Sequence, residues 1–374
     1  MESKDLGIYD IAIMGLGVAG SNLGALLKPN LKVIGIDKKD LRGDCFDEGF
    51  HKPCGGLLSQ GGQKALAKQG LTLPNALLVN PQIFAINTID FGYPHASYIH
   101  KSYVNMERHR FDLWLKGRIP SHIDTYHRAY FKQIRREGEL YHITFKQGQS
   151  FYHFKARIVV GADGAKSHLR QMLYPKLKTK SLVCIQQWYK ESNAPMLSCI
   201  FDRELSPSYS WSMSKDHYFI FGGAYLHTSC NERFKEQIKR LQSIGLHFGI
   251  PLKKEACLVL QPTRMRDFAR GHSGVFLIGE AAGFINASTL EGISGALHSS
   301  RILSEILNNI QSSTDINIKS LHILYAKRTR LLVFKTLFRH YARYPFMFIA
   351  LLRRMILRMG ILRVRSGLRD NKII

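Results

Sequence analysis

The turn at Gly15–Gly20 is the feature that most constrains how this chain can fold. The apolar segment Tyr9–Met14 runs directly into the pattern Gly-x-Gly-x-x-Gly, and a second apolar segment ends in Asp37, 17 residues after Gly20. In a strand–turn–helix unit, such glycines allow a tight turn, close approach of the backbone to a pyrophosphate, and close helix–strand packing. The N–H groups at the helix start favour the pyrophosphate, and the acid binds ribose hydroxyls. The turn therefore predicts a dinucleotide-binding βαβ unit.

Two later motifs follow the same logic. Gly161-Ala162-Asp163-Gly164 comes directly after an apolar segment, and so does Gly279-Glu280-Ala281-Ala282-Gly283, which is followed by Leu290–Ile293. Each places small residues and one carboxylate where the backbone must approach a ligand closely. Each could be an ordinary turn by itself, but the three in this order indicate one nucleotide site.

Composition narrows the class of protein. With 374 residues and an ordinary apolar fraction, the chain can form one large core or two sub-domains and is not disordered. The net charge of +25 predicts an anionic partner.

The six cysteines show neither a Cys-x-x-Cys pair nor metal-ligand spacing, so we expect reduced thiols in a cytosolic compartment and no metal site. We expect no signal peptide, since no charged segment precedes an apolar one at the N-terminus.

Hydrophobic periodicity predicts the main elements. Helices are expected over 60–69, 106–117, 232–248 and 292–309. Alternating apolar and aromatic positions predict strands over 81–104 and in the block 181–262.

The chain resembles the geranylgeranyl reductase family of FAD-dependent oxidoreductases, whose fold is of the aromatic-hydroxylase type. The resemblance covers residues 8 to about 310 and extends to the branch associated with colicin M tolerance, even at Ile185–Trp188. The motifs that carry it are Gly15-x-Gly17-x-x-Gly20, Lys52-Pro53-Cys54-Gly55-Gly56, Arg108-x-x-Phe111-Asp112-x-Trp114-Leu115, Gly161-Ala162-Asp163-Gly164-Ala165-x-Ser167, Tyr209–Lys215, Gly279–Gly283 and Glu291-Gly292-Ile293.

The resemblance implies that FAD is the cofactor and assigns residues to its parts. The pyrophosphate lies at Gly15, Gly17, Ala19 and Gly20, with Asp37 at the adenosine ribose and Arg108 on the pyrophosphate side of the flavin. Asp163 supports the pocket, Gly279 belongs to the third turn, and Glu280 faces the ribityl chain. Gly292 and Ile293 present N–H groups to the isoalloxazine, where a helix dipole stabilises reduced flavin. Most of the family has Asp where this chain has Glu280, so the ribityl contact is reached differently.

The loop Cys54-Gly55-Gly56 is implied to lie beside the flavin ring. Its thiol could gate the substrate, donate a proton, or pack as a small residue. A set of aromatic residues could form either ordinary core or the lining of an apolar tunnel for a polyprenyl chain, which binds through buried hydrocarbon area. These residues are Trp188, Trp211, Tyr218, Phe219 and Phe221.

The expected architecture is α/β, or α+β over the whole chain. A Rossmann-like FAD-binding domain is predicted from 1–80, 105–180 and 263–312. An inserted antiparallel-sheet substrate-binding domain is predicted from 81–104 and 181–262, and a basic amphipathic helical region from 313–374.

The C-terminal tail carries about half of the charge excess. From Lys327 to Lys372 there are 13 Lys and Arg residues and one acid, Asp370. The longest uncharged run, 344–352, is far shorter than the roughly 20 residues needed to span a bilayer. Basic residues at helical spacing predict amphipathic helices in an anionic membrane interface, or a helical cap with a solvated basic face. No nucleic-acid recognition module is visible.

The combined features predict a reductase that saturates C=C bonds of an isoprenoid or polyprenyl lipid. We expect it in the cytoplasm, peripheral on the inner face of the cytoplasmic membrane. The external electron donor is either NAD(P)H or a small acidic redox protein. An FAD-dependent monooxygenase or halogenase is the first alternative, although no Trp-x-Trp-x-Ile-Pro segment is present. A non-catalytic, flavin-binding membrane-associated protein is the second.

Overall fold

The computed structural model describes residues 3–40, 53–92, 97–190, 192, 197–310 and 317–358. Cys45, Lys52 and the tail beyond Arg358 lie outside these ranges. The chain forms two compact units, each built from three segments. Unit 1 comprises Met1–His51, His109–Thr179 and Pro262–Phe338; unit 2 comprises Lys52–Arg108, Lys180–Gln261 and Arg339–Ile374.

The unit boundaries fall close to the expected domain boundaries near 180 and 262. Unit 2 also takes in residues 53–80, because β3 (Leu57–Leu58) pairs with β5 (Ser97–Asn105). The tail is divided between the units at Phe338. The assignment of cofactor and substrate to particular segments remains a prediction.

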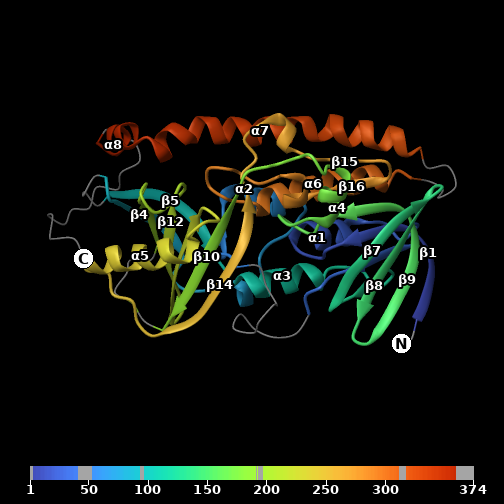
Figure 1. Cartoon of the computed structure of the whole chain (residues 1–374), viewed down its shortest axis with the longest axis horizontal. Coiled ribbons are helices and arrows are strands. Elements are labelled where there is room, and N and C mark those ends of the chain that lie inside the picture. Colours follow the sequence, from blue (N-terminus) through green and yellow to red (C-terminus); the bar gives the residue numbers. More distant parts are fainter. Residues whose placement is uncertain are drawn as a thin grey trace. The chain divides into compact units, whose positions relative to one another are not determined.

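Unit 1 is built on a largely parallel sheet in the order β15-β16-β9-β1-β2-β6 (Figure 1). The strands are rich in valine and isoleucine, and their residues are buried toward the ends at which the predicted motifs follow. Parallel strands are covered on both faces, so they need apolar residues on both. The sheet strands and the β7–β8 hairpin beside β9 are β1 (Ser3–Met14), β2 (Val33–Ile36), β6 (Asp124–Tyr126), β7 (Ala129–Glu137), β8 (Leu140–Gln147), β9 (Ser150–Gly161), β15 (Gly271–His272) and β16 (Val275–Leu277).

The helices of unit 1 include those predicted over 106–117 and 292–309, with ends shifted by a few residues. They are α1 (Val18–Leu26), α3 (Arg108–Lys116), α4 (His168–Leu173), α6 (Ile293–Leu307) and the first part of α7 (Ile318–Phe348), with short 3-10 turns η2 (Met265–Asp267) and η3 (Gly279–Ala282).

Helix α7 packs one face onto unit 1. Val333 and Leu337 join the buried core of the unit, and the buried Tyr325 donates a hydrogen bond from its hydroxyl to the Leu277 carbonyl at 2.9 Å. Its first half therefore caps the domain, as one of the two sequence interpretations expected. His322 stacks on Phe276 with ring centroids 4.0 Å apart and accepts a hydrogen bond from the Gly274 N–H.

His322 is held in its neutral form in folded unit 1, so protonation of His322 at acid pH is expected to destabilise the unit. Burial, and then the nearby His272, lower the pKa of His322 from 6.5 to about 4. Between these values the unfolded chain binds more protons than the folded one, so stability rises with pH. The contribution is complete above pH 6.5 and is lost as the pH falls toward 4. We expect a loss of about 2 kcal/mol, after allowance for partial solvent access.

Denaturant unfolding at pH 7 and pH 5 measures this loss. His322→Gln keeps an acceptor for Gly274 and should flatten the pH dependence, whereas the same change at the solvent-exposed His122 should leave it intact. An unchanged pH slope in His322→Gln would show that another group titrates.

Unit 2 is built on a second sheet in the order β14-β10-β13-β12-β11-β4-β5-β3. Its pairs are antiparallel, except that β11 runs parallel to β4. The helices are α2 (Gln60–Ala67), α5 (Cys230–Ser243), which begins and ends earlier than expected, and α8 (Ala350–Arg358), with a 3-10 turn η1 (Asn75–Leu77). The remaining strands are β4 (Ile83–Asp90), β10 (Ser181–Tyr189), β11 (Leu197–Phe201), β12 (Ser210–Lys215), β13 (Tyr218–Tyr225) and β14 (Pro251–Leu260). The expected mixed fold with a Rossmann-like sheet, a second sheet and a helical C-terminal region is confirmed.

The two faces of the second sheet have different surroundings. Helix α5 covers one face, where Phe221 stacks on Phe234 at 5.3 Å in a fully buried core with Phe219 and Tyr225 (Figure 1). Because side chains alternate along a strand, Tyr218, Ile220 and Gly222 of β13 point to the opposite face.

Helix α8 is tied to β4 by a buried ion pair. The Arg353 guanidinium donates to the Asp90 carboxylate through Nε at 2.7 Å and contacts it through Nη2 at 2.5 Å. The same guanidinium lies 4.2 Å from the Phe201 ring centroid. Among the described helices, none is long and apolar enough to cross a membrane.

Candidate functional site

The first two motifs meet at one edge of the unit 1 sheet. β1 and β9 run parallel, and the Ala162 N–H donates to the Met14 carbonyl at 2.8 Å. Gly15 has φ +97°, and a Cβ there would lie 2.9 Å from the Ala162 carbonyl oxygen and 3.0 Å from the Asp163 Cα. Only glycine meets both requirements, so the turns after β1 and β9 are held together.

The other glycines of the first turn have separate roles. A Cβ on Gly20 would lie 1.9 Å from the Gly15 carbonyl oxygen, so Gly20 is required for α1 to pack on the turn. Gly17 caps α1 with an extended backbone, and apart from its two chain neighbours no described residue has an atom within 4 Å of its Cβ position. The open space at Gly17 is the place where a ligand can approach the start of α1.

The third motif joins the same edge through α1. β16 runs parallel to β9, and Gly279 follows it with φ +58°. A Cβ on Gly279 would lie 2.9 Å from the Ala19 Cβ, so the backbone of the third turn contacts α1 directly. The contact is reinforced where Asn22 of α1 donates to the Ser300 hydroxyl of α6 at 2.8 Å. The structure thus brings Gly15, Ala19, Asp163 and Gly279 together, as the order of motifs predicted.

Asp37 follows β2 at this edge and lies in a network of donors. Its carboxylate accepts the Leu16 N–H at 3.2 Å and the Lys39 N–H at 3.1 Å. It also forms a buried ion pair with Lys116 of α3, with Nζ 3.1 Å from Oδ2. Burial and the Lys116 charge lower the pKa of the adjacent His127. Lys116 was not singled out from the sequence, because a basic residue in the last turn of a helix usually faces solvent.

Asp163 and Arg170 organise the second and third turns. The Asp163 carboxylate accepts the His168 N–H at 2.9 Å, beside the Ser167 cap of α4. Arg170 is buried, which lowers its pKa, and donates to the carbonyls of Ala281 at 3.0 Å and Asp267 at 2.8 Å. Arg170 lies six residues after Gly164 in the sequence, but only the structure shows that it holds the η3 backbone at Ala281.

The remaining predicted cofactor residues of unit 1 lie on η3 and α6. Glu280 is the second residue of η3 and is half-buried. Gly292 caps α6 and Ile293 is its first residue, as predicted. Arg108, the first residue of α3, is half-buried and clusters with unit 2.

The Cys54–Gly56 loop belongs to unit 2 and is closely packed there. The Cys54 sulfur accepts the Gly56 N–H at 3.4 Å. A Cβ on Gly55 would lie 2.5 Å from the Met213 Cε, and one on Gly56 2.2 Å from the Met106 carbonyl oxygen. The buried Lys215 ammonium donates to that same carbonyl at 2.6 Å and to Asn105 at 2.8 Å. Lys215 therefore holds the backbone of Met106, whose N–H donates to the Gly56 carbonyl of the loop at 2.9 Å.

The predicted substrate residues divide between the two faces of the second sheet. Trp188 and Tyr218 contact edge-to-face with ring centroids 6.0 Å apart. The Trp211 ring lies against Gly222, on the same face of the sheet as Trp188 and Tyr218. Phe221, and with it Phe219, lies on the opposite face in the core against α5, so neither lines a surface shared with Trp211. Periodicity could not separate them because every residue of Phe219–Phe221 is buried.

Comparison with known proteins identifies relatives for most of the chain. No family model matches. The chain is similar to Protein CbrA of Escherichia coli K12 and of Shigella sonnei Ss046, at 46% identity over 300 residues, covering 80% of this chain and 84% of each relative.

Solved structures are similar at lower identity. A geranylgeranyl bacteriochlorophyll reductase-like protein from Thermoplasma acidophilum matches with a TM-score of 0.77 and 16% identity, covering 98% of this chain and 94% of that one. PqsL of Pseudomonas aeruginosa, a probable FAD-dependent monooxygenase, matches with a TM-score of 0.65 and 14% identity, covering 94% and 99%. The parallel sheet with its three converging turns is thus the fold of FAD-dependent oxidoreductases, and the chain belongs to the CbrA family.

Proposed function

We propose that this protein is an FAD-dependent reductase that saturates C=C bonds of an isoprenoid or polyprenyl lipid at a membrane surface. The observation that carries the flavin part is the meeting of the three glycine turns at the carboxyl edge of the unit 1 sheet. In open α/β sheets, nucleotide ligands bind at this edge.

The residues at the edge fit FAD. The open space beside Gly17 suits a pyrophosphate at the start of α1, and Asp37 suits a ribose hydroxyl pair. In this proposal, the Asp37–Lys116 pair fixes the acid before the cofactor binds. Gly292 and Ile293 would hold the isoalloxazine at the start of α6. Once bound and reduced by the external donor, FAD would supply the hydride for reduction of the alkene, and a proton donor would supply the proton that completes the saturated bond.

The face of the second sheet that carries Trp211 supports the lipid part of the proposal. Trp211 and Tyr218 are half-buried, and Tyr218 packs edge-to-face on the buried Trp188, so that Trp211 and Tyr218 offer a rigid apolar surface on which a prenyl chain can lie. Cys54 is the candidate proton donor in the adjoining loop of unit 2. The Cys199 thiol is unsuited to this task because burial raises its pKa to about 12.

The exposed face of α7 supports a peripheral membrane location. Phe334 and Phe338 are 61% and 63% exposed and stack on one another, and Leu331 is also exposed on the side opposite the packed Val333 and Leu337. Exposed basic residues accompany them, at Lys327, Arg330 and Lys335. Aromatic side chains among cations suit the interface of an anionic bilayer. We propose that this face binds the inner surface of the cytoplasmic membrane.

Replacing Phe334 and Phe338 together with serine should weaken binding to anionic vesicles about 30-fold, since two partly exposed rings no longer enter the interface. Flotation with phosphatidylglycerol vesicles measures the effect. Tyr130→Ser, at a residue 54% exposed on β7, is the matched control and should bind as the wild type does. If the double variant floated with the vesicles as the wild type does, this face of α7 would not be the membrane-binding surface.

Lipid mass spectrometry tests the reaction. Cells that contain the protein should hold prenyl lipids heavier by two hydrogen atoms per reduced bond than cells that lack it, and Cys54→Ser should reduce this conversion. Oxygen consumption with a hydroxylated or halogenated product would favour the monooxygenase or halogenase alternative. Flavin that binds but never turns over with a reduced donor and prenyl lipids would favour a non-catalytic role.

A further inference from the structure

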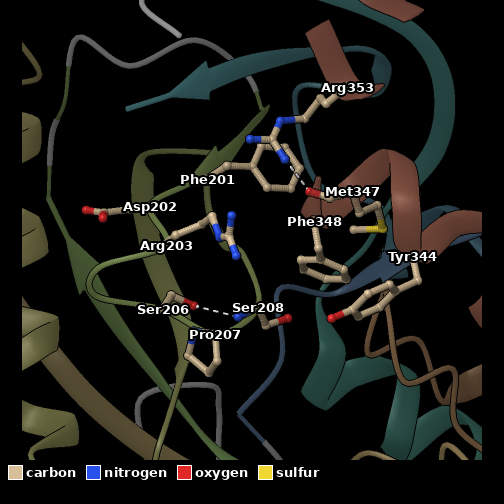
Figure 2. A pocket seen from close by; sticks show the side chains of 10 residues that line it. All are labelled: Phe201, Asp202, Arg203, Ser206, Pro207, Ser208, Tyr344, Met347, Phe348 and Arg353. Atoms are coloured by element: carbon tan, nitrogen blue, oxygen red, sulfur yellow. Dashed lines mark hydrogen bonds between the residues drawn. The ribbon is translucent and has the colours of Figure 1, made fainter. Parts of the chain in front are cut away.

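We propose that unit 2 carries a binding site for a phosphate group, formed where α7 and α8 meet the segment after β11. The site goes beyond the proposed reductase function and shares no residue with the flavin or prenyl surfaces. It is the pocket of Figure 2, lined by Phe201, Asp202, Arg203, Ser206, Pro207, Ser208, Tyr344, Met347, Phe348 and Arg353.

The pocket offers donors that the described residues leave unused. The Ser208 side chain is buried, with 4% exposure, and its hydroxyl has no hydrogen-bond partner in the part of the chain that the structure describes. The neighbouring Ser206 differs, because its hydroxyl donates to the Ala224 carbonyl at 2.6 Å and accepts the Ser208 N–H at 3.2 Å (Figure 2). A buried hydroxyl without a partner is uncommon and points to a polar ligand.

The charges of the pocket favour an anion. The Asp202 carboxylate, which points away from the Ser208 hydroxyl in Figure 2, pairs with Arg240 at 3.3 Å. Arg353 pairs with Asp90. Arg203 is exposed and forms no ion pair with a carboxylate of the described residues. The pocket-lining charge that remains uncompensated is therefore a guanidinium, which binds phosphate oxygens in a bidentate manner.

The lining also suits the carbon part of a phosphate ester. Met347 and Phe348 supply apolar walls, and the Tyr344 hydroxyl adds a further donor at the edge. Arg203, Ser208 and Tyr344 together would bind the phosphate oxygens. A lipid head group and a soluble phosphate share this chemistry.

Calorimetric titration of the full chain tests the site and separates the two sources. The probes are monomeric dihexanoyl phosphatidic acid, glycerol 1-phosphate, inorganic phosphate and the phosphate-free dihexanoyl glycerol. We expect saturable binding of the phosphate-bearing probes only. Tighter binding of the lipid indicates a head-group site, and equal binding of all phosphates indicates a free-phosphate site.

Variants assign the binding to the pocket. Arg203→Gln should weaken it about tenfold and Ser208→Ala about threefold, as expected for the loss of a charged and of a neutral donor. Lys239→Gln removes an exposed basic residue of α5 in the same unit and should change nothing. Absence of saturable binding, or wild-type binding by Arg203→Gln, would overturn the proposal. Flavin binding measured on the same samples should be unaffected, so a failure here is distinct from a failure of the reductase function.

Discussion

Replacing Gly17 with valine is expected to lower FAD affinity about 100-fold while leaving the thermal stability of the apoprotein unchanged. The backbone of Gly17 is extended, which valine adopts without strain, and its Cβ position faces open space. The Cβ of the new side chain would therefore contact no described residue other than its chain neighbours, and the side chain would extend into the place where the pyrophosphate approaches α1. Flavin fluorescence titration and a thermal melt measure the two effects.

Two other glycines of the same helix serve as controls. Gly20→Ala should lose both flavin and stability, because its Cβ would lie 1.9 Å from the Gly15 carbonyl oxygen. Gly24→Ala should keep both, since its Cβ would meet the Ile119 side chain at an ordinary 3.5 Å. Wild-type affinity in Gly17→Val would mean that the dinucleotide does not approach the start of α1.

Replacing Arg353 with methionine is expected to lower the free energy of unfolding of unit 2 by about 4 kcal/mol. The side chains of Arg353 and Asp90 are only 7% and 5% exposed, so methionine would leave the carboxylate buried without its cation. The contact of the guanidinium with the Phe201 ring would be lost as well. Chemical denaturation followed by Trp188 and Trp211 fluorescence measures the change.

A second variant separates the loss of pairing from the loss of packing. Arg353→Met combined with Asp90→Leu removes both charges and should recover most of the stability, as buried ion pairs replaced by apolar residues usually do. If the free energy of unfolding of Arg353→Met alone stayed within about 1 kcal/mol of the wild-type value, solvent would have to reach Asp90 and compensate its charge.

The strand-end motifs could be predicted from the sequence because their information is local. Gly15 and Gly279 each follow an apolar strand, and each has a positive φ, a backbone conformation that glycine adopts far more readily than other residues. Their order along the chain also implied one shared edge, since parallel strands present their carboxyl ends together.

The pairing partners were decided by the tertiary structure alone. Lys116 lies 79 residues after Asp37, and Arg353 lies 263 residues after Asp90, and nothing near any of these positions marks its partner. The two faces of β13 likewise could not be told apart by pattern, because apolar residues occupy both. Packing of α5 against one face placed Phe221 in the core and left Trp211 on the other. Alternation along a strand determines which residues share a face, but what covers that face depends on contacts between distant segments.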